Sequence, residues 1–274
     1  MDLRIPMETV TLTGRISKNL VVQRSDHTTI RYTAAGPADG PALVLIHGWA
    51  CDRGDFDAVT GHLPDGYRVL AVDLAEHGES RSTREVWTME EFARDVAAVL
   101  EAESVTTAVV AGHSLGAAVA VEVGRLLPDA VSHVVALDGL LHLSMFPAQS
   151  EERISTVVGM FHDDFPAAVR GLVEGGSPAG TDPALTDAYF EKMVAVRQPA
   201  GLRAIEGLVR WDMDAVLRET KQPITVFAVR DLVTQEAIDR YGDRLDIVLV
   251  DLGSHHFPVE APEATARLLS DVMG

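Results

Sequence analysis

The chain has 274 residues, of which 47% are hydrophobic and 23% are charged, as in ordinary globular proteins. This length suffices for one large domain, or for a core domain that carries an inserted subdomain. The 41 acidic and 23 basic residues give a formal net charge of −18, which argues against nucleic acid or an anionic membrane as partner. A single cysteine excludes an internal disulfide framework and a cysteine cluster for a metal.

The first residues, MDLRIPMETV, lack the basic start and apolar core of a secretory signal. No apolar run reaches the roughly 18 residues that a membrane-spanning helix needs. We therefore expect a cytoplasmic protein that acts on a small molecule and binds no membrane.

The first half of the chain predicts an antiparallel pair of strands followed by alternating strands and helices. Residues 10–16 and 28–34 have β-like composition, with no helix between them. Short apolar runs then alternate with segments of helical spacing, a pattern typical of a parallel sheet with helices on both faces. The expected strands end near residues 47, 73, 110 and 138, and the expected helices cover 55–62, 88–103 and 117–127.

The alternation stops between residues 139 and 222. This segment contains helical stretches but no convincing strand, and we interpret it as a helical cap over the carboxyl edge of the sheet. The helical stretches are 151–162, 165–174, 183–197 and 202–218. Strands at 223–231 and 245–253 and helices at 234–241 and 262–273 resume the pattern, so the core is expected to comprise 1–138 and 223–274.

Ser114 stands between a predicted strand and a predicted helix, in the sequence GHSLG. So sharp a turn forces its central residue into strained backbone geometry, and the flanking Gly112 and Gly116 let the strand and helix approach each other. The motif alone is also compatible with an ordinary glycine-rich turn.

Polar residues with catalytic chemistry follow several other predicted strands. In an open parallel sheet, ligands bind outside the carboxyl ends of the strands, so these residues should share one rim with Ser114. A serine hydroxyl becomes a nucleophile when an imidazole takes its proton and a carboxylate orients that imidazole. The residues on the rim are the 47–49 turn, Asp138, Asp231, His255 and His256.

Five segments in order resemble the α/β-hydrolase fold family: HGW at 47–49, DLAEHGES at 73–80, GHSLG at 112–116, RDLVTQEA at 230–237 and HHFPVEAPE at 255–263. The resemblance covers nearly the whole chain. It implies a mostly parallel central sheet with helices on both faces and a helical cap insertion.

The same resemblance implies roles for individual residues. Ser114 corresponds to the nucleophile, and His256, which precedes Phe257 and Pro258, corresponds to the general base. Asp231 corresponds to the triad acid; Asp138 is the alternative acid, because some members of the family take their acid from that strand. The oxyanion hole is implied at the backbone N–H groups of Trp49 and Leu115, and no metal or organic cofactor is implied.

Several further side chains are candidates for the pocket. His255 crowds the expected base and is itself an alternative base, whereas His47 and His113 are expected to brace their loops. Trp211 could contact substrate, although packing is its simpler role. Cys51 is more typical of a small buried apolar residue than of a nucleophile. The pocket candidates are therefore His47, His113, Trp211 and His255.

Three functions remain open at this point. The first is a serine hydrolase that cleaves an ester, lactone or similar acyl bond through an acyl-enzyme. The second is a cofactor-independent dioxygenase or C–C bond hydrolase, because GWACD resembles a segment of the dioxygenase branch, whose acid lies where Asp138 does. The third is a non-enzymatic small-molecule receptor on the same fold, since the fold alone does not choose a reaction.

Overall fold

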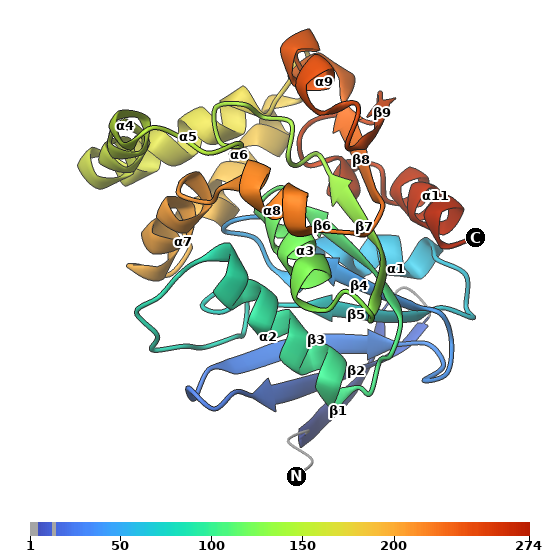
Figure 1. The fold of residues 1–274 in the computed structure, drawn as a ribbon. Coiled ribbons are helices and arrows are strands. Elements are labelled where there is room, and N and C mark those ends of the chain that lie inside the picture. The colour runs from blue at the N-terminus through green and yellow to red at the C-terminus, as the bar shows by residue number, and fades with distance from the viewer. Residues whose placement is uncertain (1–4, 13–14) are drawn as a thin grey trace.

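The computed structural model describes the backbone of residues 5–12 and 15–274, and the side chains from Ser17 onward. The described strands form one sheet in the order β1-β2-β3-β5-β4-β6-β7-β8-β9 (Figure 1). The pairs β1/β2, β2/β3 and β3/β5 are antiparallel, and the pairs from β5 through β4 to β9 are parallel. The strands are β1 (Ile5–Leu12), β2 (Arg15–Gln23), β3 (Thr29–Ala35), β4 (Ala42–Ile46), β5 (Arg68–Val72), β6 (Ala108–His113), β7 (Val131–Leu137), β8 (Ile224–Val229) and β9 (Asp246–Val250).

The central strands are buried on both faces, as their continuous apolar sequences predict. All five residues of β4 are buried, and successive side chains point to opposite faces of the sheet. Val44 and Ile46 belong to one apolar cluster, and Leu43 and Leu45 belong to another. The expectation of a mostly parallel sheet with helices on both faces is confirmed.

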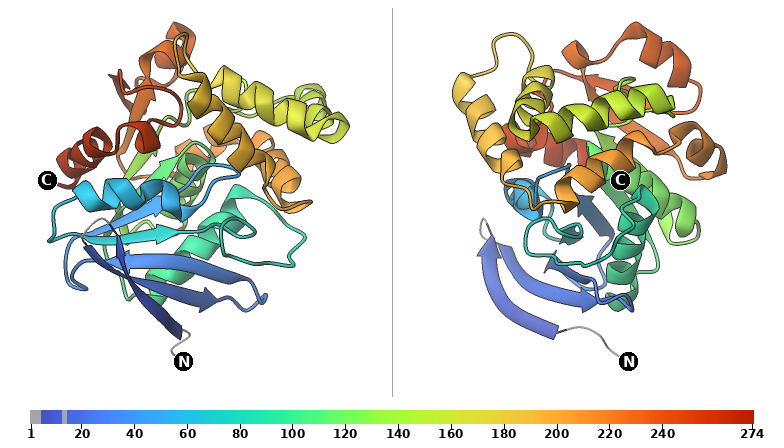
Figure 2. Two further views of the ribbon diagram at one scale, coloured as in Figure 1. Left: turned by 180° about the vertical axis from the view of Figure 1, so that it is seen from behind. Right: turned by 90° about the vertical axis from the view of Figure 1, so that its left-hand side faces the viewer.

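Helices cover both faces of this sheet (Figures 1 and 2). Helices α2 and α3 pack together on the face that includes Val44, and α1 and α11 pack together on the opposite face. The start of α2 follows from its sequence, because the Thr88 side chain accepts a hydrogen bond from the Glu91 N–H. These helices are α1 (Asp57–His62), α2 (Met89–Ala102), α3 (Leu115–Leu126), α9 (Gln235–Tyr241), α10 (Phe257–Glu260) and α11 (Pro262–Met273), with short 3₁₀ turns η1 (Arg53–Phe56) and η2 (Arg230–Leu232).

Five helices lie between β7 and β8 in the chain. The first four, α4 to α7, form a group beside the sheet, whereas α8 packs against α3 (Figures 1 and 2). Within the described part of the chain, no helix is long and apolar enough to cross a membrane. The five are α4 (Glu151–Asp163), α5 (Phe165–Gly175), α6 (Pro183–Val194), α7 (Ala200–Val209) and α8 (Met213–Glu219).

Two expected elements are wrong in detail. The strand expected at 10–16 spans the end of β1 and the beginning of β2, and residues 13–14 between them lie outside the described residues. The helix expected at 202–218 is two helices, α7 and α8. The Asp212 side chain caps α8 by accepting a hydrogen bond from the Ala215 N–H, so a new helix begins at Met213. The helical spacing of the sequence continues across this interruption and therefore does not reveal it.

Candidate active site

Ser114 occupies the sharp turn that its sequence predicts. It joins β6 to α3 with φ 52° and ψ −117°, a region that residues other than glycine rarely adopt. Close backbone contacts require glycine at both flanking positions. A Cβ on Gly112 would lie 1.9 Å from the Gly116 carbonyl oxygen, and a Cβ on Gly116 would lie 2.3 Å from the Ile46 carbonyl oxygen. This strained turn presents the serine at the end of the central strand.

The 47–49 turn after β4 packs directly against Ser114. A Cβ on Gly48 would lie 3.3 Å from Cβ of Ser114 and 2.9 Å from Nδ1 of His113. Leu115 is the first residue of α3, so its N–H has no acceptor within the helix. The amides of Leu115 and Trp49, which the sequence proposes as an oxyanion hole, therefore belong to two backbone segments that meet at Ser114.

The carboxylate that reaches an active-site imidazole belongs to Asp138. Its Oδ2 lies 2.6 Å from Nδ1 of His255, and its Oδ1 accepts a hydrogen bond of 2.8 Å from the Val229 N–H. The Asp138 side chain is fully buried. Burial disfavours its charge, but hydrogen bonds from His142 and His255 outweigh this effect and lower the pKa of Asp138 below its usual value.

The expected hydrogen bond between Asp231 and His256 is wrong. Asp231 lies exposed in the 3₁₀ turn η2, on the surface side of the loop after β8. Asp138 instead reaches inward because it directly follows β7 and adopts a positive φ of 45°, which turns the chain at that point. Asp138, which the resemblance gave as the alternative acid, therefore lies beside the imidazole of His255.

His256 lines the same pocket, but among the described residues its side chain has no hydrogen bond to the Asp138 carboxylate. Its ring stacks on Tyr189 of α6, with centroids 4.0 Å apart and an interplanar angle of 22°. Burial, together with the imidazoles of His255 and His113, lowers the pKa of His256 well below its usual range. The Tyr189 hydroxyl donates to Glu260, so this stack links α6 to the loop that carries both histidines.

The backbone around His255 is held from two sides. Its N–H donates to the Gly176 carbonyl oxygen at 2.8 Å, and its carbonyl oxygen accepts from Nε2 of His113, also at 2.8 Å. Gly176 directly follows α5, so the segment between β7 and β8 takes part in placing His255. Burial lowers the pKa of His113 to about 3, which keeps this imidazole neutral.

A second imidazole reaches the same carboxylate. Nε2 of His142 lies 3.2 Å from Oδ2 of Asp138 and 3.2 Å from its backbone oxygen. Burial disfavours the charged form of His142, but its hydrogen bond to Asp138 outweighs burial and raises the pKa of His142. Asp138, His142 and His255 together form a group whose ligand-type atoms lie within 4.8 Å of one another.

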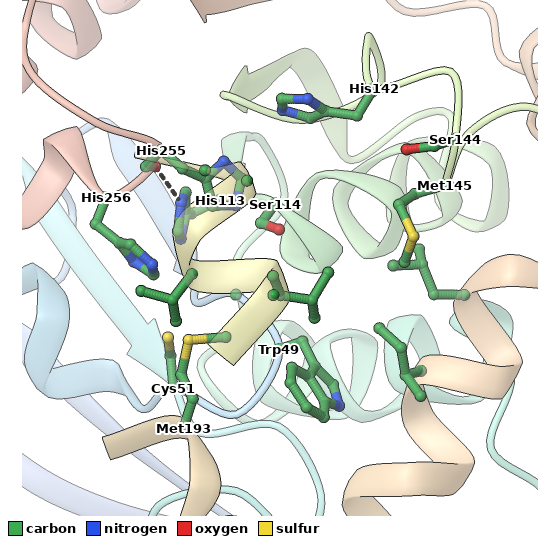
Figure 3. Close-up of a pocket in the computed structure, with 18 of the residues that line it drawn as sticks. Trp49, Cys51, His113, Ser114, His142, Ser144, Met145, Met193, His255 and His256 are labelled. Atoms are coloured by element: carbon green, nitrogen blue, oxygen red, sulfur yellow. Dashed lines mark hydrogen bonds between the residues drawn. The ribbon is translucent and has the colours of Figure 1, made fainter. Parts of the chain in front are cut away.

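A small pocket brings these groups together (Figure 3). It has a volume of about 290 Å³ and lies between the loops after the central strands and helices α5, α6 and α7. His142 and Ser144 lie at one end of it in this view, and Trp49 and Met193 lie at the other. Ser114, His255 and His256 also line it, and most of the remaining wall is apolar.

Two of the four pocket candidates do not line this pocket. His47, the first residue of the 47–49 turn, is buried, and its Nδ1 donates to the Gly48 oxygen while its Nε2 accepts from the Leu74 N–H. Trp211 is packed between core residues and donates to Glu122 at 2.7 Å. His113 and His255 do line the pocket. Cys51 also lines it, and burial raises the pKa of its thiol well above the usual value, as for an inert residue.

Tyr189 was not assigned to the site from sequence, and the sequence left open whether His142 lines a pocket or is exposed. Both lie on the segment between β7 and β8, whose position over the sheet follows from tertiary packing alone. Only the four-residue separation of His142 from Asp138 carries a signal, and it becomes meaningful once Asp138 is known to face inward.

Comparisons with known proteins show the family to which the chain belongs. A model described as the alpha/beta hydrolase family matches residues 43–268. A pimeloyl-[acyl-carrier protein] methyl ester esterase of Methylococcus capsulatus is 31% identical over 248 residues, which cover 85% of this chain and 94% of that protein. A 2-(acetamidomethylene)succinate hydrolase of Mesorhizobium japonicum is 25% identical over 272 residues, 93% of this chain and 96% of that protein.

A solved structure shows the same fold. The esterase from Exiguobacterium antarcticum superimposes with a TM-score of 0.78 over 92% of this chain and 98% of its own. Its sequence identity is 17%, so the likeness concerns the arrangement of the chain.

Proposed function

Because the chain belongs to the alpha/beta hydrolase family, we propose that it cleaves an ester, lactone or similar acyl bond of a small molecule through an acyl-enzyme on Ser114. One observation carries this proposal. The Asp138 carboxylate lies 2.6 Å from Nδ1 of His255, and His255 lines the same pocket as Ser114 in its strained turn.

The proposed first half of the reaction uses His255 as the base. Since Nδ1 of His255 donates to Asp138, the other ring nitrogen, Nε2, carries a lone pair. Nε2 takes the proton of the Ser114 hydroxyl while Oγ bonds to the substrate carbonyl carbon. Asp138 stabilises the imidazolium that forms and holds the ring in the required tautomer.

The amides of Trp49 and Leu115 then stabilise the oxyanion, each worth on the order of 3 kcal/mol in the transition state. His255 returns the proton to the departing alkoxide, which leaves as an alcohol. A water molecule attacks the acyl group on Ser114 with the same base, releasing a carboxylic acid and restoring the enzyme.

The pocket favours a small uncharged substrate. Its volume of about 290 Å³ is at the low end for ligand sites. Among the described residues that line it, the ionisable side chains are Cys51 and four histidines, without a lysine, arginine or carboxylate. An anionic substrate would therefore find no permanent counter-charge on these walls.

The direct test is hydrolysis of p-nitrophenyl acetate, butyrate and octanoate by the purified protein. The proposal expects release of p-nitrophenol, fastest with the short chains, and loss of this activity after treatment with a fluorophosphonate that reacts with serine nucleophiles. An enzyme that turns over none of these esters and does not react with the fluorophosphonate would contradict it.

One observation favours a second candidate, the cofactor-independent dioxygenase. That branch, as the sequence resemblance implies, takes its acid from the position of Asp138, and Asp138 is the residue that meets His255. Oxygen uptake with a hydroxyquinolone-type substrate, measured with an oxygen electrode, tests this candidate. Uptake with such a substrate and no ester hydrolysis would replace the first proposal by the second.

A further inference from the structure

One oxygen of the Asp138 carboxylate lies within hydrogen-bond distance of two imidazole nitrogens. Oδ2 lies 2.6 Å from Nδ1 of His255 and 3.2 Å from Nε2 of His142. A catalytic triad needs one of these contacts, so the second, from His142, is left without a role in the proposed mechanism. Two imidazole nitrogens and one carboxylate oxygen that converge in this way are also the donor set of a transition-metal site.

We propose that Asp138, His142 and His255 bind Zn²⁺, and that zinc bound there inhibits the enzyme. Zinc accepts imidazole nitrogen and carboxylate oxygen together, and sites with two histidines and one carboxylate keep a fourth position open. Magnesium and calcium prefer oxygen ligands in greater number, so they do not fit this set. The binding follows from geometry alone, whereas the inhibition rests on the proposed function.

The three donor atoms need little movement to hold an ion. Two ligands about 2.0–2.1 Å from a tetrahedral zinc ion are about 3.3–3.5 Å apart. Oδ2 of Asp138 is already 3.2 Å from Nε2 of His142, and all three atoms lie within 4.8 Å of one another. The Asp138–His255 contact must lengthen by less than about 1 Å from its 2.6 Å.

The surroundings keep these ligands oriented and reachable. The second oxygen of Asp138 accepts from the Val229 N–H at 2.8 Å, the kind of outer hydrogen bond that orients a ligating carboxylate. The backbone of His255 is held by Gly176 and His113. His142 and His255 both line the pocket, with side chains 23% and 18% exposed, so an ion can enter from that side.

Zinc in this position opposes catalysis through the tautomer of His255. Binding to the metal requires the lone pair of Nδ1, so the proton of the neutral ring must reside on Nε2. An Nε2 that already carries a proton cannot accept one from Ser114. The ion also takes the Asp138 oxygen that orients the imidazole.

Binding is tested by isothermal titration calorimetry of tag-free protein with ZnCl₂, and separately with MgCl₂. The expected result is one saturable zinc site per chain and no magnesium binding at the same concentrations. His142→Ala should weaken zinc binding at least about tenfold. His162→Ala, which removes an exposed histidine on α4, is the matched control and should bind zinc like the unaltered protein.

Inhibition is measured separately, as p-nitrophenyl acetate hydrolysis with and without ZnCl₂, each variant relative to its own zinc-free rate. Zinc should inhibit the unaltered protein and His162→Ala in the concentration range of the calorimetric site, and chelation by EDTA should reverse the effect. His142→Ala should need at least about tenfold more zinc.

The outcomes separate the zinc site from its inhibitory role. Absence of saturable zinc binding, or equal binding by His142→Ala, overturns the site whatever the protein catalyses. Binding that depends on His142 in a protein without ester hydrolysis supports the site and counts against the proposed function instead. Binding that depends on His142 without inhibition of an active enzyme overturns the inhibitory role.

Discussion

Nδ1 of His255 lies 2.6 Å from Oδ2 of Asp138, although 117 positions separate the two residues in the chain. Asp138 follows β7, and His255 lies in the loop after β9. The two loops meet because β7, β8 and β9 are neighbours in one parallel sheet, so their carboxyl ends lie on the same edge.

Ser114→Ala should reduce ester hydrolysis roughly 10³-fold or more, because the acyl-enzyme can no longer form. The fold should be retained, since alanine keeps the Cβ atom that serine already places in this turn. Steady-state kinetics with p-nitrophenyl acetate and a thermal melt measure the two effects. Ser25→Ala, at an exposed position that does not line the pocket, serves as control and should keep full activity. Comparable rates for the two variants would contradict the nucleophile assignment.

Asp138→Asn and Asp231→Asn form a matched pair. The first should lower kcat roughly 10⁴-fold, because an amide in place of the carboxylate favours the wrong tautomer of His255. The second should change kcat by less than about threefold, because Asp231 is exposed in η2. Both rates come from the same ester assay. The reverse order would restore Asp231 as the triad acid.

His255→Ala and His256→Ala should separate catalysis from packing. His255→Ala removes the proposed base and should cost roughly 10³-fold or more in kcat. His256→Ala should keep far more turnover but lower the free energy of unfolding by about 1–3 kcal/mol, because it removes a buried ring stacked on Tyr189. Kinetics and urea unfolding measure the two quantities, and His256→Phe should recover part of the stability. A larger kcat loss for His256→Ala would make His256 the base.

Gly112→Ala and Gly159→Ala should affect stability in opposite directions. A Cβ on Gly112 would lie 1.9 Å from the backbone oxygen of Gly116, so the strand and helix must separate, at a cost of about 3 kcal/mol or more. A Cβ on Gly159, within α4, meets nothing within 4 Å and should stabilise the protein by about 0.5–1 kcal/mol. Urea unfolding of both variants measures the difference, and equal stability would mean that the turn at Ser114 relaxes easily.

His77 should make the protein less stable in acid. Burial, reinforced by the nearby His47, lowers the pKa of His77 to about 3, and its Nε2 has no hydrogen-bond partner among the described residues. Below pH about 6.5 the unfolded chain binds a proton at His77, whereas the folded chain does not. The free energy of unfolding therefore falls as pH drops from about 6.5 to 3.

The corresponding variant is His77→Gln. Between pH 6 and pH 4 its free energy of unfolding should depend less steeply on pH, by up to about 1.4 kcal/mol per pH unit. Urea unfolding at several pH values measures these slopes. Above pH 7.5 the two proteins should show parallel pH dependence, which serves as the internal control. Identical slopes below pH 6 would mean that His77 is protonated in the folded protein.

The sequence by itself determined the sheet and the place of the nucleophile candidate. Continuous apolar runs such as residues 42–46 leave no polar face, so both faces must be covered, and the structure confirms this. The sequence GHSLG places Ser114 in a strained turn because the contacts at Gly112 and Gly116 exclude larger residues. Both inferences were available from short stretches of sequence, although the contact that requires glycine at 116 is with the Ile46 carbonyl oxygen of β4.

Only the tertiary structure decided which acid and which imidazole meet. Asp138 and Asp231 both follow strands that end at the same edge of the sheet, and local sequence does not say which one turns inward. His255 and His256 are adjacent, so their side chains leave the backbone in different directions. Contacts of the loop with His113, Gly176 and Tyr189 orient His255 toward Asp138 and His256 toward α6. These contacts join segments far apart in the chain, which is why no pattern of neighbouring residues predicts them.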